Sequence, residues 1–179
     1  MKKRNSVFIA TSIDGFIADK NGGIAWLNSI PNPDNLDMGY VAFMETVDAI
    51  VMGRNTFEIV CSFDMDWPYT IHVFVLSNSL KEISEEYQNK AFLVSGGLDN
   101  ILDSIHQKGF NSLYIDGGAT IQNFLKEDLI DDLILSTIPV ILGEGIPLFS
   151  SLPEPLNFEL KNSRTYLNQL VQRHYKRKK

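Results

Sequence analysis

The 179 residues include a single cysteine, Cys61, which excludes an internal disulfide and a zinc site built from cysteines. The three histidines, His72, His106 and His174, lie far apart and lack the spacing of a metal site or a catalytic triad. We therefore expect no bound metal. Common nucleotide-binding fingerprints are missing as well, because no G-x-G-x-x-G follows the first strand-like run and no G-x-x-x-x-G-K-[ST] occurs.

Basic charge is also scarce. Sixteen lysines and arginines stand against 22 acidic residues, a net charge of -6, which argues against a nucleic-acid groove. The apolar run that follows Lys2–Arg4 is cut short by Asp14, and no stretch is long enough to span a bilayer. We expect a cytoplasmic protein whose partner is a small-molecule substrate, and neither a nucleic acid nor a membrane.

Hydrophobic residues make up 44% of the chain, enough for one domain covering residues 1–179. Apolar runs alternate with segments of helical periodicity, which predicts an α/β fold with a mostly parallel sheet and a C-terminal antiparallel hairpin. The expected strands are Val7–Ile13, Ala49–Met52, Ile71–Leu76, Phe92–Val94, Leu113–Ile115, Leu133–Ile138, Phe158–Tyr166 and Gln169–Lys176, and the expected helices are about Asp37–Val47, Arg54–Cys61, Asn100–Lys108 and Ala119–Glu127.

Two junctions between a strand and a helix carry glycines. Gly53 follows the strand that ends at Met52, and Gly117 with Gly118 follows the strand that ends at Ile115. A helix N-terminus offers free N–H groups to a phosphate, and glycine lets the backbone approach a ligand closely. Either junction alone is explained by a tight turn, but two in one sheet could grip the phosphates of a dinucleotide.

The order of these motifs resembles the dihydrofolate-reductase-like superfamily. The segments "FIATSIDGFIADKNGGIAWL", "IVMGRNTFE", "FVLSNS", "YIDGGATIQNFL" and "LILSTIPVILGEGIPLF" carry the resemblance, from about Val7 to Phe149. M-G-R-x-T and I-D-G-G-A-T are its most specific pieces. The ending "IPVILGEGIPLF" is most similar to the reductase domain of riboflavin biosynthesis, which in bifunctional relatives is the C-terminal domain beside a deaminase. The resemblance implies a three-layer α-β-α fold and NADPH as the cofactor.

The resemblance also implies the cofactor-binding residues. The paired glycines would lie against the pyrophosphate, joined by a cis peptide bond, and Asp19–Trp26 would form a mobile loop over the nicotinamide. The implied residues are Ala10, Ile17 and Ala18 at the nicotinamide; Gly53, Arg54, Asn55 and Thr56, with Leu76, Ser77 and Asn78, on the adenosine side; and Ile115, Gly117, Gly118, Ala119 and Thr120 at the pyrophosphate.

Asp37 is the candidate catalytic residue. Hydride addition to a C=N or C=O group leaves an electron-rich atom that must be protonated. Asp37 stands at the head of the helix before "AIVMGR", near where folate reductases carry their carboxylate. The alternative is an ordinary acidic residue at a helix N-terminus, favoured by the helix dipole.

The arginine distribution bears on the substrate. Between Arg4 and Arg164 the only arginine is Arg54, and the stretch "FDMDWPYT" carries two aspartates but no basic residue. A bidentate clamp for the folate carboxylates is therefore missing. We expect an NADPH-dependent reductase, as a homodimer, that transfers a hydride to a small heterocyclic or carbonyl substrate, similar to the 5-amino-6-(5-phosphoribosylamino)uracil reductase of riboflavin biosynthesis. The alternatives are a true dihydrofolate reductase and a non-catalytic, dimeric dinucleotide-binding module.

Overall fold

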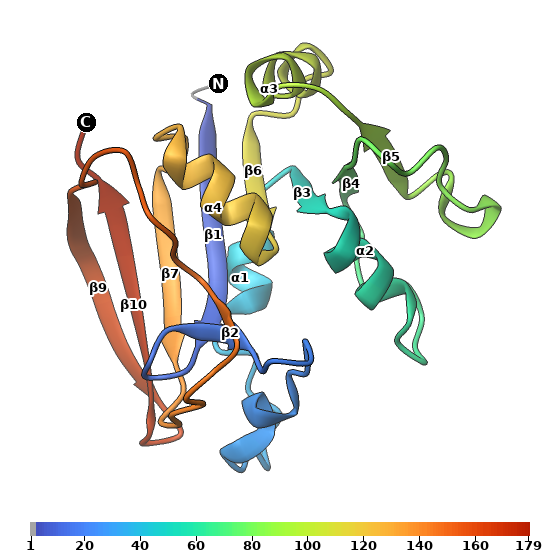
Figure 1. Ribbon diagram of the computed structural model, residues 1–179. Coiled ribbons are helices and arrows are strands. Elements are labelled where there is room, and N and C mark those ends of the chain that lie inside the picture. Colours follow the sequence, from blue (N-terminus) through green and yellow to red (C-terminus); the bar gives the residue numbers. More distant parts are fainter. Residues whose placement is uncertain (1–2) are drawn as a thin grey trace.

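An eight-stranded sheet forms the centre of the computed structural model, which describes residues 3–179 (Figure 1). Its strand order is β5-β4-β3-β6-β1-β7-β10-β9, and all pairs from β5 to β7 are parallel, whereas β10 and β9 are antiparallel. The mostly parallel sheet and the C-terminal hairpin are thus confirmed. The strands of this sheet are β1 (Arg4–Thr11), β3 (Ala49–Gly53), β4 (His72–Leu76), β5 (Ala91–Val94), β6 (Ser112–Asp116), β7 (Asp132–Thr137), β9 (Phe158–Tyr166) and β10 (Leu170–Arg177).

Alternating side chains of the central strands bury two cores on opposite faces of the sheet. In β3, Ala49 and Val51 pack with helices α3 (Leu98–Gln107) and α4 (Gly118–Lys126). Ile50 and Met52 pack on the other face with α1 (Tyr40–Met44) and α2 (Arg54–Cys61). The result is the expected three-layer α-β-α arrangement. Within residues 3–179, no helix combines the length and apolar character needed to cross a membrane.

Strand β1 begins and ends earlier than predicted, at Arg4 and Thr11 rather than at Val7 and Ile13. The polar residue Asn5 is buried in this strand, and both its backbone N–H and its side-chain NH2 group find hydrogen-bond acceptors. Its side-chain amide donates to the carbonyl of Leu129 at 2.8 Å, and its backbone N–H donates to the Asp131 carboxylate at 3.0 Å. Apolar periodicity does not detect a strand whose buried residues are polar.

Helix α1 is shorter than the predicted Asp37–Val47 and covers only Tyr40–Met44. Two residues before it take left-handed backbone conformations, Met38 with φ 54° and Gly39 with φ 84°. A left-handed residue cannot continue a right-handed helix, so the chain turns here and the helix starts one residue later. The prediction of this helix start was therefore wrong.

Three of the four remaining short elements form a small lobe at one end of the sheet (Figure 1). The strands β2 (Phe16–Ala18) and β8 (Ile146–Pro147) pair in a separate two-stranded sheet, and a 3-10 helix, η1 (Ala25–Ser29), follows β2. A second 3-10 helix, η2 (Glu85–Tyr87), precedes β5. Sequence periodicity predicted none of these elements, because segments of two to five residues are too short to show a period.

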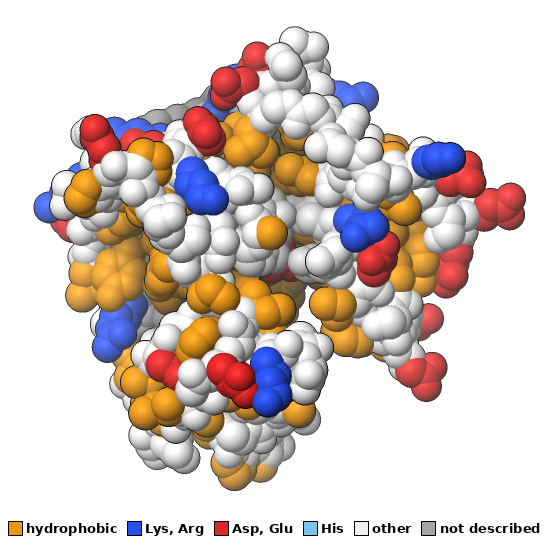
Figure 2. Space-filling model, in the orientation of Figure 1, with side chains coloured by type: hydrophobic (Ala, Val, Ile, Leu, Met, Phe, Trp, Pro, Cys, Tyr) orange, Lys and Arg blue, Asp and Glu red, His pale blue; other side chains and the backbone are white. Residues whose placement is uncertain are grey.

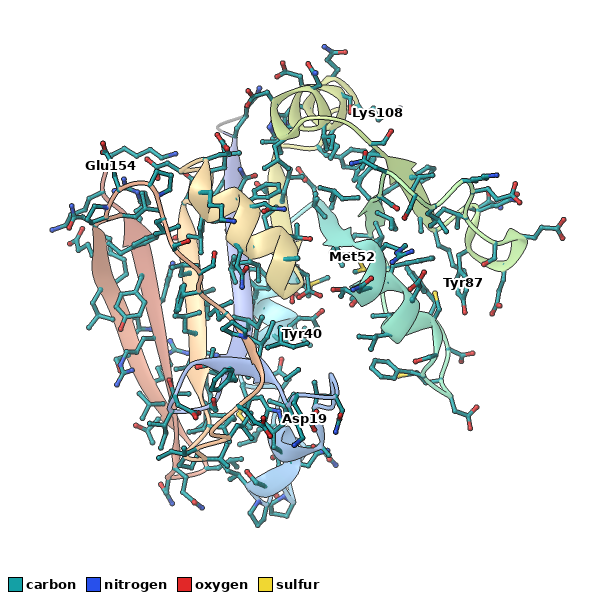
Figure 3. All side chains as sticks on the ribbon, viewed as in Figure 1. Asp19, Tyr40, Met52, Tyr87, Lys108 and Glu154 are labelled. Atoms are coloured by element: carbon teal, nitrogen blue, oxygen red, sulfur yellow. The ribbon has the colours of Figure 1, made fainter. Side chains whose placement is uncertain are left out.

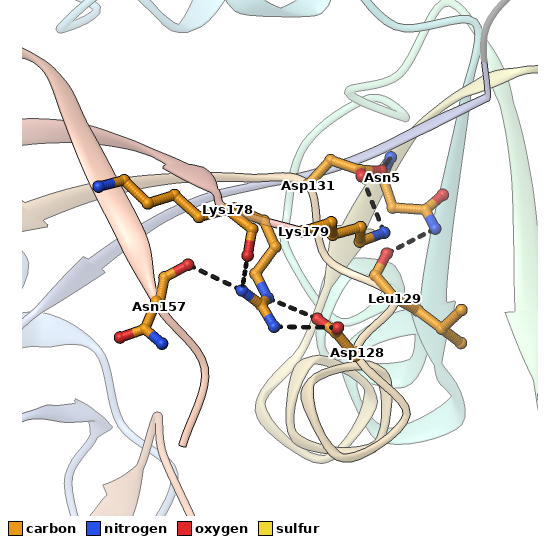
Figure 4. A network of polar contacts seen from close by, with 8 residues as sticks. Asn5, Asp128, Leu129, Asp131, Asn157, Lys178 and Lys179 are labelled. Carbon is orange, nitrogen blue, oxygen red and sulfur yellow. Dashed lines mark hydrogen bonds and ion pairs between the residues drawn. The ribbon is translucent and has the colours of Figure 1, made fainter. Parts of the chain in front are cut away.

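Polar contacts at the C-terminus hold the closing hairpin to the turn after α4 (Figure 4). The guanidinium of Arg177 donates to both carboxylate oxygens of Asp128, at 2.6 and 3.0 Å, and also to the carbonyls of Asn157 and Lys178. Nearby, the Lys179 ammonium lies 3.2 Å from the Asp131 carboxylate. The Arg177 side chain is only 11% exposed, so its paired geometry is shielded from solvent.

We expect Arg177→Lys to lower the free energy of unfolding by about 1.5 kcal/mol, because a lysine keeps the charge but loses the paired hydrogen bonds. Lys179→Ala is the matched control, since it removes a more exposed ion pair and should cost about 0.5 kcal/mol or less. Urea denaturation of both variants measures the difference. Equal losses would show that the paired geometry adds nothing.

Candidate active site

A cavity of about 900 Å³ opens along the carboxyl ends of the parallel strands. Five strands of the main sheet contribute to its lining, and Figure 2 shows the molecule hollowed between its main body and the lower lobe. In open α/β sheets, ligands bind at this edge because loops and helix N-termini meet there. The lining residues from the main sheet are Ile9 and Ala10 of β1, Gly53 of β3, Leu76 of β4, Val94 of β5 and Asp116 of β6.

The centre of the cavity lies where β3 and β6 end side by side. These strands are neighbours in the sheet, with Met52 opposite Asp116. The helices that follow them pack on opposite faces, α2 in one core and α4 in the other. The two helix N-termini therefore both border one crevice, and their free N–H groups and positive dipole ends favour an anion there.

Glycines make this convergence sterically possible. Gly117 has φ 89° and ψ 134°, a conformation that side chains disfavour, and a Cβ there would overlap the Thr56 hydroxyl. A Cβ on Gly53 would lie 3.0 Å from the Thr120 hydroxyl oxygen. No cis peptide occurs in residues 3–179, so the expected cis bond between Gly117 and Gly118 was wrong. The positive φ of Gly117 turns the chain instead.

The structure brings together all but one of the residues predicted to bind the cofactor. The exception, Ile115, is fully buried in the core beneath the cavity. That the other predicted residues contact NADPH remains a prediction. The residues that line the cavity are Ala10, Ile17, Ala18, Gly53, Arg54, Asn55, Thr56, Leu76, Ser77, Asn78, Gly117, Gly118, Ala119 and Thr120.

Asp37 lies outside the lining, on an exposed segment. Its carboxylate accepts the N–H groups of Val41 at 2.7 Å and of Gly39 at 3.0 Å. These hydrogen bonds, that of Val41 above all, lower the pKa of Asp37 and keep it ionised. The geometry is that of an acidic residue at a helix N-terminus, the alternative to a catalytic role. The structure does not bring Asp37 to the cavity.

Besides Glu127, just after α4, one other carboxyl group among residues 3–179 lines the cavity, that of Asp116 at the end of β6. Burial raises the pKa of this carboxyl, although one of its oxygens accepts the N–H of Gly117 at 2.8 Å. Tyrosines surround it. Burial, and then the charge of Asp116, raise the pKa of Tyr40 to about 12 and that of Tyr69 further. In I-D-G-G-A-T, the two glycines were predicted to bind the cofactor, whereas no role was predicted for the aspartate before them.

The lobe closes one side of the cavity, and Figure 3 shows Asp19 on it below Tyr40. Asp19 organises its turn by accepting the N–H groups of Asn21 and Gly23, at 2.8 and 2.9 Å. Gly22 and Ile24, from the same turn, line the cavity. The predicted covering loop thus borders the site, and its mobility stays a prediction.

Two cations border the cavity. Arg54 begins α2, and its Nε lies 3.7 Å from Glu58, an exposed ion pair between residues four apart. Lys126 ends α4 and lines the cavity, as does the next residue, Glu127. The sequence analysis did not single out Lys126, because a lysine in the last turn of a helix is common.

A sequence model of a known protein family, the RibD C-terminal domain, matches residues 6–172. The chain belongs to this family. A structure from Shewanella sp. PV-4, of a protein assigned to riboflavin biosynthesis, is 55% identical in sequence, with a TM-score of 0.96 and coverage of 98% of this chain and 99% of that one.

Two more distant structures confirm the dihydrofolate-reductase-like fold. The diaminohydroxyphosphoribosylaminopyrimidine deaminase/5-amino-6-(5-phosphoribosylamino)uracil reductase of Thermotoga maritima has a TM-score of 0.76 at 15% identity, covering 99% of this chain and 57% of that one. The dihydrofolate reductase of Enterococcus faecalis has a TM-score of 0.68 at 16% identity, covering 98% and 97%. The resemblance read from the motifs is therefore confirmed at the level of family and fold.

We expect Gly117→Ala to lower the free energy of unfolding by about 1–3 kcal/mol, because the backbone conformation and the Thr56 hydroxyl both oppose a side chain. Gly118→Ala is the matched control. Gly118 is already helical, and its added Cβ would meet only the flexible tip of Ile17, at 2.7 Å. Its change should stay within about 1 kcal/mol of zero. Denaturant titration of the two variants decides, and equal effects would contradict the steric account.

Proposed function

We propose that the protein is an NADPH-dependent reductase that transfers a hydride to a small heterocyclic or carbonyl acceptor. Membership of the RibD C-terminal domain family supports a reductase of the riboflavin-pathway type. The observation that carries the cofactor assignment is the crevice between β3 and β6, where two glycine-bearing helix N-termini converge. The Enterococcus faecalis reductase of the same fold is a complex with NADP(H), which supports the same cofactor.

The cavity residues fit a dinucleotide phosphate. The backbone N–H groups of the first turns of α2 and α4 can donate to the pyrophosphate, and glycines leave room for its close approach. Arg54 and Lys126 supply positive charge for the further phosphate that distinguishes NADPH from NADH. A volume of about 900 Å³ lies within the usual range of ligand cavities.

NADPH, when bound, supplies the hydride. The chain then has to hold the acceptor, exclude water and deliver a proton. Apolar residues such as Ala10, Ile17 and Ala18 line the cavity near the end of β1. Asp116 keeps its proton to a higher pH than an exposed carboxyl, so it can donate a proton to the acceptor. Asp116 is therefore better placed than Asp37 to be the acid of the reaction.

The alternatives differ from this proposal in measurable ways. For a dihydrofolate reductase, the cavity offers only Arg54 and Lys126 as cations among the described residues, and both are assigned to the cofactor. A non-catalytic module would bind NADPH without oxidising it. Calorimetric titration with NADPH, followed by absorbance assays with a panel of acceptors including dihydrofolate, separates these functions. The homodimer stays a prediction, which light scattering measures.

Arg54→Ala should weaken NADPH binding at least about tenfold, equivalent to about 1.4 kcal/mol, and barely change NADH binding. Glu58→Ala is the matched control, since it removes the other half of the 3.7 Å ion pair and leaves the guanidinium free for phosphate. It should keep or strengthen NADPH binding. Equal losses for both cofactors in Arg54→Ala would refute the NADPH assignment.

Asp116→Asn should lower kcat about 100-fold once an acceptor is known, because the amide has the same shape but no acidic proton. A group with a raised pKa is fully protonated below that pKa and loses its proton as pH rises through it. The wild-type kcat should therefore fall with rising pH, and the variant should lose this dependence. Asp37→Asn is the comparison, and a larger effect there would return the catalytic role to Asp37.

A further inference from the structure

The positive charge of the cavity is confined to one part of it. Lys126 is the last residue of α4, and Figure 1 shows that α4 runs away from the lobe of β2 and η1. Arg54 is the first residue of α2, close to the crevice between β3 and β6. Arg54 thus lies with the helix N-termini assigned to the cofactor phosphates, and Lys126 lies at the other end of α4, away from the lobe.

The other part of the cavity is apolar, and we call it the substrate end. It is formed by the second half of α2 with the loop after it, and by the lobe. Several of its side chains are exposed although they are hydrophobic: Ile24 and Phe63 are 41% exposed and Ile59 is 45% exposed. The lining residues of the substrate end are Ile24, Leu27, Ile59, Val60, Phe63 and Tyr69.

No lysine or arginine among residues 3–179 lines the substrate end. The nearest basic residue in the lobe, Lys20, is outside the lining, and its ammonium lies 2.6 Å from the Glu144 carboxylate. A phosphate that entered this end would lose water without gaining a cation. Arginine or lysine is what proteins use to hold phosphate groups.

The polar groups that the substrate end does offer suit a neutral molecule with hydrogen-bond donors. Asp116, at the end of β6 where the crevice begins, lines the cavity close enough to Tyr69 of the substrate end for its charge to raise the pKa of that phenol. A carboxyl group accepts hydrogen bonds from ring N–H groups or hydroxyls, and repels an anion whenever it is ionised. The apolar lining residues favour a ring that carries no charge.

We propose that the acceptor is an uncharged, phosphate-free heterocycle whose N–H or hydroxyl groups face Asp116. This inference rests on the proposed reductase function. It distinguishes the chain from the Thermotoga maritima relative, whose named reaction uses a phosphoribosyl compound. The charge that the ribose phosphate would need is absent from the substrate end among the described residues.

Matched probes with and without phosphate test this selectivity. The two pairs are FMN with riboflavin, and 5-amino-6-(5-phosphoribosylamino)uracil with its phosphatase product. Each probe is titrated into the full-length protein saturated with NADP⁺, so that the readout does not depend on turnover. The phosphate-free member of at least one pair should bind at least about tenfold more tightly than its partner. Tighter or equal binding of the phosphorylated member in either pair, or binding of none of the four probes, overturns the proposal.

A cation added at the rim should reverse the selectivity. Phe63→Arg places a guanidinium at the substrate end and should raise the affinity for the phosphorylated probes at least about tenfold. Met65→Arg is the matched control, because Met65 lies in the same loop, is 63% exposed and does not line the cavity. An equal gain in both variants, or none in Phe63→Arg, contradicts the location of the acceptor. Failure of the reductase function is seen separately, as absence of NADPH binding by the unmodified protein.

Discussion

The site depends on one steric constraint, the close approach of two chain segments where β3 and β6 end side by side. The helices after these strands leave toward opposite faces of the sheet, so their N-termini meet across a crevice. Gly117 accommodates the approach because it has no Cβ to overlap Thr56, and Gly53 because a Cβ would crowd Thr120. With larger residues the strands would still pair, but the crevice would be filled by side chains.

This arrangement separates two kinds of chemistry within one cavity. The helix N-termini and Arg54 favour an anion at the crevice, and Lys126 adds a further cation at the opposite end of α4. The substrate end has apolar walls and adjoins the carboxyl group of Asp116, whose pKa is raised by desolvation. An anionic group is stabilised in the first part and penalised in the second. This charge pattern is the basis for the proposed placement of the cofactor and the acceptor along the cavity.

Asp37 and Asp116 show what sequence motifs can and cannot predict about the site. Asp37 was selected for its place before a predicted helix, and that helix starts three residues later, after a left-handed turn. Its carboxylate is engaged by backbone N–H groups at the surface. Asp116 belongs to the I-D-G-G-A-T motif. Tyr40 and Tyr69, which lie close to it in the fold, come from segments far away in the chain. Backbone turns and long-range burial leave little trace in local periodicity.

The amino-acid sequence alone predicted the α/β class and the mostly parallel sheet with its closing hairpin. It also predicted the helix starts after glycine at Arg54 and near Gly118. These features depend on local periodicity and on backbone freedom, which are properties of short segments. Three features are decided only by the tertiary structure: the desolvation of Asp116, the position of Lys126 at the cavity, and the apolar substrate end. Burial and electrostatic fields arise from the sum of distant neighbours, and no local pattern encodes that sum.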